Sequence, residues 1–221
     1  RIRAELRERG VEPVLAEDAL HAAAVDWTVQ LEAIAERRFG DTVPGDRREA
    51  AYADTLIDLG GGRVVLDART LAKMLDALDI QPDEMVLDIG CGLGYSTAVL
   101  ADLADFVVGV EDDPEWVDEA QRNLSEQSVD NAAAFVGPLA EGQAKNGPYD
   151  IIILQGAVEH VPDGLTDQLK EGGRICAIFA DGALGDVRIG YKIDGVVTWR
   201  PIFNALAPVL PGFEAHRAFS F

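Results

Sequence analysis

The chain has 221 residues, which is long enough for one α/β domain with a small addition. Of these residues 48% are hydrophobic, which is typical of a globular protein. It carries 39 acidic residues against 19 lysines and arginines, which gives a formal net charge of −20 at pH 7. Such a charge repels nucleic-acid phosphates and anionic lipids, so we expect neither nucleic acid nor a membrane as a partner.

Two cysteines bear on the compartment and on metal binding. Cys91 lies inside a glycine-rich stretch and Cys176 inside an apolar run, so neither position suggests a disulfide framework, and two thiols alone do not make a zinc site. No apolar run approaches the roughly 18 residues of a membrane span, and RIRAELRERG at the start lacks the apolar core of a signal peptide. We therefore expect a cytoplasmic protein without a metal or a membrane anchor.

The first part of the chain predicts helices. Residues 15–39 carry helical periodicity, and the turn-rich stretch 40–49 marks a loop. We therefore predict a helical N-terminal cap over 1–48 and a core over 49–221, together one compact domain. Within the core, ARTLAKMLDALDI predicts a helix over 68–80. One face of that helix carries Leu71, Met74, Leu75 and Leu78.

Five short apolar or β-branched runs follow, and they predict strands that are buried on both faces. These runs are residues 85–89, 106–111, 133–136, 150–154 and 173–179. The stretches between them have helical periodicity over residues 95–104, 113–127 and 161–173. Alternating strands and helices indicate a parallel sheet with right-handed crossovers. The expected fold class is therefore α/β, with a Rossmann-like, doubly wound and mostly parallel sheet.

The last part of the chain changes character. Residues 187–202 place an Asp-Gly turn between two β-rich runs, which predicts an antiparallel hairpin. The final segment, residues 214–221, predicts an edge strand. The C-terminal end of the sheet is therefore expected to be antiparallel.

The stretch VLDIGCGLGYSTAVLA, residues 86–101, places Gly90, Gly92 and Gly94 between a predicted buried strand and a helix. Glycine costs about 0.5–1 kcal/mol against alanine in regular structure, so a ligand that touches the backbone explains these glycines better than packing does. In a doubly wound sheet, ligands bind at the carboxyl ends of the strands. Glu111 ends the next predicted strand, where a carboxylate binds ribose hydroxyls. The pattern predicts a nucleotide-like cofactor.

The spacing Gly90-x-Gly92-x-Gly94, preceded by Asp88, resembles motif I of the S-adenosylmethionine-dependent methyltransferases. A dinucleotide fingerprint spaces its last two glycines as G-x-x-G, so a nicotinamide-dependent oxidoreductase is disfavoured. The resemblance implies S-adenosylmethionine as the cofactor, with the loop glycines and Cys91 at its amino-acid end and the carboxylate of the second strand at its ribose. Asp88 then either organises the loop or meets the ammonium group.

A longer part of the chain resembles the protein-L-isoaspartate O-methyltransferase family. The resemblance covers about residues 50–180 and includes GPLAEG after the third predicted strand and PYDIIILQGAVEHVPDGLTDQLKEGGR after it. It implies that Gly137, Pro138 and Leu139 lie near the adenine, where the family usually has Gly-Asp-Gly. Gln155, which ends the fourth predicted strand, joins the candidate cofactor-binding residues.

One departure from the family falls at a stretch implied to hold the substrate. The family has Ser-Ala-Pro-His, whose serine is thought to position the substrate carboxylate, and here Leu66, Asp67, Ala68 and Arg69 take its place. Leu66 thus stands at the candidate catalytic position without a hydroxyl group. Arg69 or Arg63 is a candidate to present a guanidinium fork to the carboxylate instead.

Further candidates lie on either side of the glycine loop. His160, beside Glu159, follows the fourth predicted strand and is a candidate to accept a proton from an acceptor. Tyr52 and Asp54 match the family's Tyr-x-Asp and are candidates to line the cleft.

Two functions stay open from the sequence. The first is a carboxyl methyltransferase that acts on isoaspartyl residues of a peptide or protein, or on a related small carboxylate acceptor. The second is a cofactor-binding protein of the same fold with another acceptor or with no catalytic activity, in a regulatory or interaction role. The missing serine favours the second function, and the complete glycine loop favours the first.

Overall fold

The computed structural model describes residues 56–181 and 184–215. The predicted cap over residues 1–48, with Tyr52 and Asp54, lies outside the described residues. In chain order, the described elements are β1 (Ile57–Gly60), β2 (Arg63–Val65), α5 (Ala68–Leu78), β3 (Met85–Ile89), α6 (Tyr95–Ala101), β4 (Phe106–Glu111), α7 (Pro114–Glu126), β5 (Ala132–Val136), the 3-10 helices η1 (Leu139–Glu141) and η2 (Ala144–Asn146), β6 (Tyr149–Val158), α8 (Asp163–Thr166), β7 (Leu169–Asp181), β8 (Leu184–Ile193) and β9 (Val196–Asn204).

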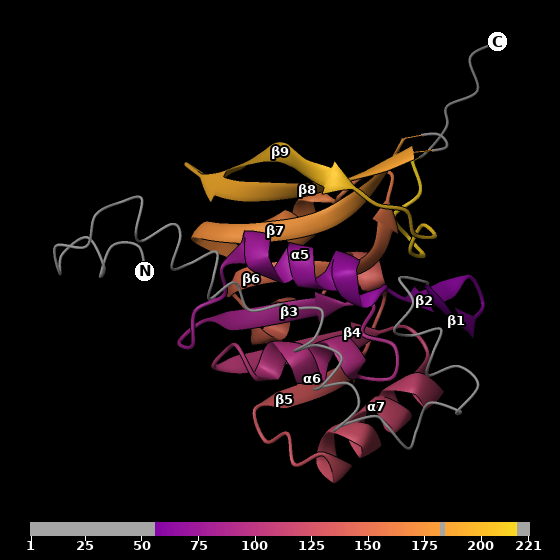
Figure 1. The fold of residues 1–221 in the computed structure, drawn as a ribbon. Helices are drawn as coiled ribbons and strands as arrows, with labels where there is room; N and C mark the ends of the chain where they lie inside the picture. Colours follow the sequence, from indigo (N-terminus) through magenta and orange to yellow (C-terminus); the bar gives the residue numbers. More distant parts are fainter. Residues whose placement is uncertain (1–55, 182–183, 216–221) are drawn as a thin grey trace, which may run out of the picture.

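Within the described part of the chain, one seven-stranded sheet has the order β5-β4-β3-β6-β7-β8-β9 (Figure 1). The strands from β5 to β7 pair in parallel, and β8 and β9 add antiparallel strands. The expected α/β class, a mostly parallel Rossmann-like sheet with an antiparallel C-terminal hairpin, is confirmed. The carboxyl ends of β3 and β4 lie next to each other, because these two strands are parallel neighbours.

A separate two-stranded sheet precedes this core. Strands β1 and β2 pair antiparallel around Gly60, Gly61 and Gly62, which all have positive φ. This hairpin does not belong to the seven-stranded sheet. The stretch of sequence before the predicted helix over residues 68–80 therefore forms a hairpin that leads directly into α5.

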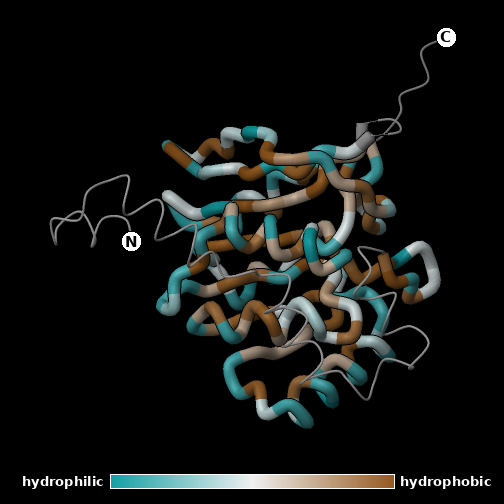
Figure 2. The backbone as a smooth tube through the Cα atoms, viewed as in Figure 1, coloured by the Kyte–Doolittle hydropathy of each residue, from teal (hydrophilic) through white to brown (hydrophobic). Residues whose placement is uncertain are grey.

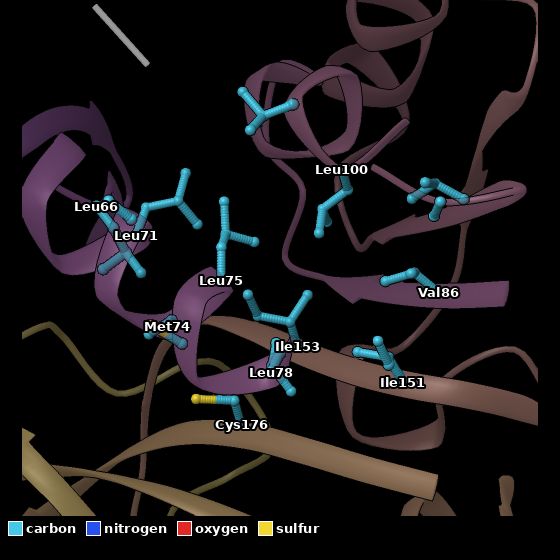
Figure 3. Packing of buried hydrophobic residues seen from close by; sticks show 14 of the residues in the cluster. Leu66, Leu71, Met74, Leu75, Leu78, Val86, Leu100, Ile151, Ile153 and Cys176 are labelled. Carbon is cyan, nitrogen blue, oxygen red and sulfur yellow. The ribbon is translucent and has the colours of Figure 1, made fainter. Parts of the chain in front are cut away.

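The helices α5, α6 and α7 cover one face of the sheet (Figure 1). The four leucine and methionine residues expected on one face of the first core helix are buried, and they pack on apolar side chains of the central strands (Figure 3). Asp67 caps that helix, because its carboxylate accepts a hydrogen bond from the amide of Thr70 at 2.8 Å.

The opposite face of the sheet is covered by shorter segments. Leu139 of η1, Leu165 of α8 and Phe213 near the end of the described chain are buried against alternate residues of the same strands. Figure 2 shows hydrophobic residues along the central strands and hydrophilic residues at many of the turns. Both faces of β3, β4 and β6 are therefore buried, as their apolar runs predict. For β5 the prediction is wrong, because only Ala134 of that strand is buried and Val136 is exposed.

The helix expected over residues 161–173 is wrong for most of its length. Only α8, with four residues, is helical, and β7 already begins at Leu169. Gly173 has no room for a side chain, because a Cβ there would lie 2.8 Å from the carbonyl oxygen of Lys170 and 3.0 Å from that of Asp150. The stretch is a strand because it pairs with β6, with Leu169 opposite Tyr149 and Arg174 opposite Ile151.

The C-terminal hairpin is confirmed, with longer strands than expected. Asp194 and Gly195 form its turn with φ of 53° and 77°, and the register of the two strands shifts where Arg188 pairs with Pro201. The expected final strand is wrong where it is described, because Glu214 and Ala215 lie outside any strand. In the described part of the chain, β9 ends the sheet, and no described helix is long and apolar enough to cross a membrane.

Candidate cofactor site

The glycine loop joins β3 to α6 at the carboxyl edge of the sheet. Gly90, Gly92 and Gly94 have φ of 78°, 54° and 90°, a backbone region that residues other than glycine rarely adopt. The backbone of the loop is tied to β4, because the amides of Gly90 and Cys91 both donate to the carbonyl oxygen of Val110, at 2.8 and 3.2 Å. The three glycines are therefore required by the course of the backbone itself.

Asp88 lies under this loop at the end of β3 and is fully buried. One of its oxygens accepts hydrogen bonds from the hydroxyl groups of Ser96 and Thr97, and the other accepts from the side-chain amide of Gln155, all at 2.7 Å. Burial raises the pKa of Asp88, although these three hydrogen bonds oppose the shift. Of the two roles predicted for Asp88, this network supports the organisation of the loop. The side-chain amide of Gln155 therefore supports the loop indirectly, through its hydrogen bond to the carboxylate of Asp88.

Cys91 also points into the protein. Its side chain is buried, and desolvation, together with the charges of Asp88 and Glu111, raises the pKa of the thiol well above its usual range. A thiol of this kind is not a nucleophile at neutral pH. Cys91 therefore serves the loop as a small buried side chain.

Glu111, at the end of β4, is fully buried and pairs with Arg63 of β2. The Nη1 and Nη2 atoms of Arg63 donate to Oε1 and Oε2 of Glu111 at 2.7 and 2.8 Å, and the amide of Gly92 donates to Oε2 at 2.7 Å. Burial opposes the charged form, but the hydrogen bonds from Arg63 hold the pKa of Glu111 below its usual range. The carboxylate predicted for the ribose is thus an ionised group with both oxygens engaged by an arginine.

The β1–β2 hairpin covers the loop from outside. A Cβ built on Gly90 would lie 2.8 Å from Nη2 of Arg63, and a Cβ on Gly92 would lie 3.0 Å from Cδ1 of Leu59. The guanidinium carbon of Arg63 also lies 5.7 Å from the ring centre of Trp116, in α7. Side chains of the hairpin therefore lie on the backbone surface that the sequence predicts for the cofactor.

The remaining predicted cofactor residues follow β5. The amide of Gly137 donates to the carbonyl oxygen of Glu111 at 2.9 Å, which places this turn beside the end of β4. Pro138 is exposed, whereas the side chain of Leu139 is buried in the core of the second face. Gly137 and Pro138 thus lie near Glu111, the residue predicted to bind the ribose, whereas Leu139 packs into the hydrophobic core.

The three candidate catalytic residues are not brought together in one cluster. Leu66 is buried and packs with Leu71 in the apolar core (Figure 3), Arg69 is exposed in the first turn of α5, and His160 is exposed after β6. The neighbour of His160, Glu159, accepts a hydrogen bond from the amide of Ala215 at 2.6 Å. These roles stay predictions.

Sequence reasoning missed the position of Arg63 on Glu111. Arg63 is one of two candidates, with Arg69, to present a fork to a substrate carboxylate, whereas in the structure its fork engages a carboxylate of the protein itself. The available signal was the run of three glycines before Arg63, which indicates a tight turn.

Comparison with known proteins extends these observations. The family model of protein-L-isoaspartate(D-aspartate) O-methyltransferase matches residues 23–183. The chain is 40% identical over 145 residues to a protein-L-isoaspartate O-methyltransferase of Myxococcus xanthus, covering 66% of this chain and 68% of that protein. It is 32% identical over 189 residues to the enzyme of the same name from Hyperthermus butylicus, covering 80% and 78%.

Solved structures agree in fold. A structure named protein-L-isoaspartate O-methyltransferase superposes with a TM-score of 0.69 at 22% identity, covering 84% of this chain and 66% of that one. A Plasmodium falciparum structure, described as a putative enzyme of this kind in complex with S-adenosyl-L-homocysteine, has a TM-score of 0.61 at 18% identity, covering 82% and 96%.

Proposed function

This chain belongs to the protein-L-isoaspartate(D-aspartate) O-methyltransferase family, and from that premise we propose that it transfers a methyl group from S-adenosylmethionine to the carboxylate of an isoaspartyl residue in a damaged peptide or protein. The observation that carries the proposal is the glycine loop with the buried carboxylate of Glu111 at the neighbouring strand end, inside the span that the family model matches. The proposed setting is the cytoplasm.

The residues at this edge of the sheet fit the cofactor. Gly90 and Gly92 carry no side chain on the loop surface assigned to the cofactor, and the carboxylate of Glu111 has the two acceptor oxygens that ribose hydroxyls need, although Arg63 holds both oxygens in this structure. The turn at Gly137 and Pro138, where adenine is assigned, is hydrogen-bonded to the backbone carbonyl oxygen of Glu111. When bound, the cofactor supplies an electrophilic methyl group on a sulfonium, a cation that suits the acidic surroundings of the loop.

The acceptor needs little chemical activation. A carboxylate with a pKa near 4 is ionised and nucleophilic at neutral pH, so orientation supplies most of the rate and general-base catalysis adds little. Arg69, exposed at the start of α5, is the proposed partner of the acceptor carboxylate. His160 has no necessary role in this reaction, although it would serve a hydroxyl or amine acceptor.

A second candidate function rests on Leu66. Its side chain lies in the apolar core and provides no hydroxyl group toward an acceptor. A protein that binds the cofactor but methylates another acceptor, or none, is therefore the alternative.

One assay separates the two candidates. The full chain is incubated with S-adenosylmethionine and an isoaspartyl peptide, with the aspartyl peptide of the same sequence as the control, and the formation of S-adenosylhomocysteine is measured. Calorimetry with S-adenosylhomocysteine and with NAD runs in parallel. Methylation of the isoaspartyl peptide alone supports the first function. Binding of S-adenosylhomocysteine without methylation supports the second, and binding of NAD alone contradicts both.

A further inference from the structure

We propose that Arg63 is an internal competitor of the cofactor: its guanidinium holds the carboxylate of Glu111, and S-adenosylmethionine binds only by displacing it. The inference rests on the proposed function, which assigns Glu111 to the ribose.

Arg63 binds the carboxylate of Glu111 in the way that a bound ligand would. Arg63 is 6% exposed and Glu111 is 0% exposed, and the two parallel hydrogen bonds of 2.7 and 2.8 Å use both oxygens of the carboxylate. A ribose with two hydroxyl groups requires those same acceptors. Oε1 also accepts from the amide of Asp112 at 3.0 Å and Oε2 from that of Gly92 at 2.7 Å, so each oxygen already has two donors. The nucleoside therefore does not add to this arrangement but has to replace the guanidinium.

The space is shared as well as the carboxylate. Nη2 of Arg63 lies on the open side of Gly90, 2.8 Å from an ideal Cβ, and the guanidinium stands 5.7 Å from the ring centre of Trp116. Leu59, from the other strand of the hairpin, lies in the same way over Gly92. The hairpin thus covers the two glycines whose missing side chains the proposed function explains by a bound cofactor.

One atom marks the pairing as incomplete. Nε of Arg63 is a buried donor without a hydrogen-bond partner among the described residues. Buried polar groups of native proteins are nearly always paired, so a permanent structural arginine would be expected to use this N–H group. The guanidinium pairs with Glu111 and, through Nη1 at 3.2 Å, with Oδ1 of Asp112, but its Nε–H group has no acceptor among the described residues.

The architecture of the β1–β2 hairpin also allows it to move away from the glycine loop. It forms a two-stranded sheet of its own, outside the seven-stranded sheet, and its turn consists of the exposed residues Gly60, Gly61 and Gly62. Two-stranded hairpins are marginally stable on their own. Withdrawal of Arg63 breaks its contacts to the glycine loop, to Glu111 and to Asp112, but it breaks no strand pairing of the seven-stranded sheet, because β1 and β2 pair only with each other in the described part of the chain.

The test is calorimetric titration of the full chain with S-adenosylhomocysteine. Arg63→Ala removes the competitor and is expected to bind at least tenfold more tightly than the natural protein, and Arg63→Lys, which presents one ammonium group in place of the fork, is expected to fall between them. Arg122→Ala is the matched control, because Arg122 pairs with Glu119 at 2.6 Å on the exposed side of α7, and its affinity is expected to be unchanged.

A second measurement, made on the natural protein, tests the inference if the Arg63→Ala variant does not fold. In the natural protein, hydrogen exchange of the amides of residues 57–65 is followed with and without S-adenosylhomocysteine, and the inference expects faster exchange when the ligand is bound. Slower exchange there, or weaker or equal binding by the Arg63 variants, overturns the inference while the proposed function stands. If the natural protein and both Arg63 variants fail to bind, both the inference and the proposed function are wrong.

Discussion

Gly94 packs directly on Ala120: a Cβ built on Gly94 would lie 3.3 Å from the Cα, the Cβ and the carbonyl oxygen of Ala120. This contact brings the last residue of the glycine loop against α7, and φ of Gly94 is +90°. The loop is thus fixed from below by a helix that follows the next strand of the sheet.

We expect Gly94→Ala to lower the free energy of unfolding by more than the roughly 1–2 kcal/mol that a positive φ costs an L-residue, because the contact with α7 adds to it. Urea denaturation measures the change. Gly61→Ala is the matched control, since Gly61 also has a positive φ but no atom within 4 Å of its ideal Cβ. Equal losses in the two variants would show that the packing on Ala120 contributes nothing.

Gly92→Val is expected to abolish binding of S-adenosylhomocysteine while the protein stays folded. The ideal Cβ already lies 3.0 Å from Leu59, and the two further methyl groups would occupy the approach to the loop backbone. Calorimetry measures the binding, and circular dichroism checks the fold. Adding Leu59→Ala relieves the contact with the hairpin and is not expected to restore binding. Normal affinity in the single variant would mean that the loop does not carry the cofactor.

The Arg63–Glu111 pair gives a dependence of stability on pH. The pKa of Glu111 is lowered in the folded protein, so the unfolded chain binds more protons at acidic pH, and the stabilisation is present above the unfolded pKa of about 4.3 and is lost as the pH falls through the folded value. At pH 7, Glu111→Gln is expected to cost about 3 kcal/mol, the lower end for a broken buried pair.

Urea denaturation at pH 7 and at pH 3 tests this difference. The loss caused by Glu111→Gln is expected to shrink at pH 3, whereas Glu119→Gln, in the exposed pair with Arg122, is expected to change stability by less than about 1 kcal/mol at pH 7. A loss from Glu111→Gln that is the same at both pH values would contradict the assignment of this stabilisation to the ion pair.

Leu66→Ser is expected to destabilise the protein and not to create a faster enzyme. Truncation of a buried leucine costs about 2–5 kcal/mol, and a buried hydroxyl group without a partner adds about 1–3 kcal/mol. Leu66→Ala leaves the same cavity without the hydroxyl group and is the control. If Leu66→Ser methylates an isoaspartyl peptide faster than Leu66→Ala, the hydroxyl group reaches the acceptor and Leu66 stands in the acceptor site.

Much of the fold could be predicted because its signals are local. The apolar runs that became β3, β4 and β6 are long enough to be recognised as strands, and their order along the chain implies a parallel sheet. The helix over residues 161–173 was wrong because local periodicity does not register the pairing of the stretch from Leu169 with β6.

The site was predictable in part for the same reason. The loop glycines and Glu111 follow directly from the ends of two strands, so their neighbourhood is a property of the topology. Arg63 and Glu111 are separated by 48 residues and meet only through the hairpin. No spacing rule connects two such positions, and the burial of Leu66 likewise depends on packing partners from distant segments.

The outer side of β9 has a consequence for how the protein behaves at high concentration. Among the described residues no strand pairs with this side of β9. An edge of that kind is a template for association with another chain, and natural proteins interrupt such edges with prolines, charges and bulges. Here Pro201, which has no amide proton, stands at the register shift beside Arg200, whereas Ile193 and Val196 at the hairpin end are exposed. Among the features that the structure describes, the stretch around Pro201 is therefore the one expected to limit association along this edge.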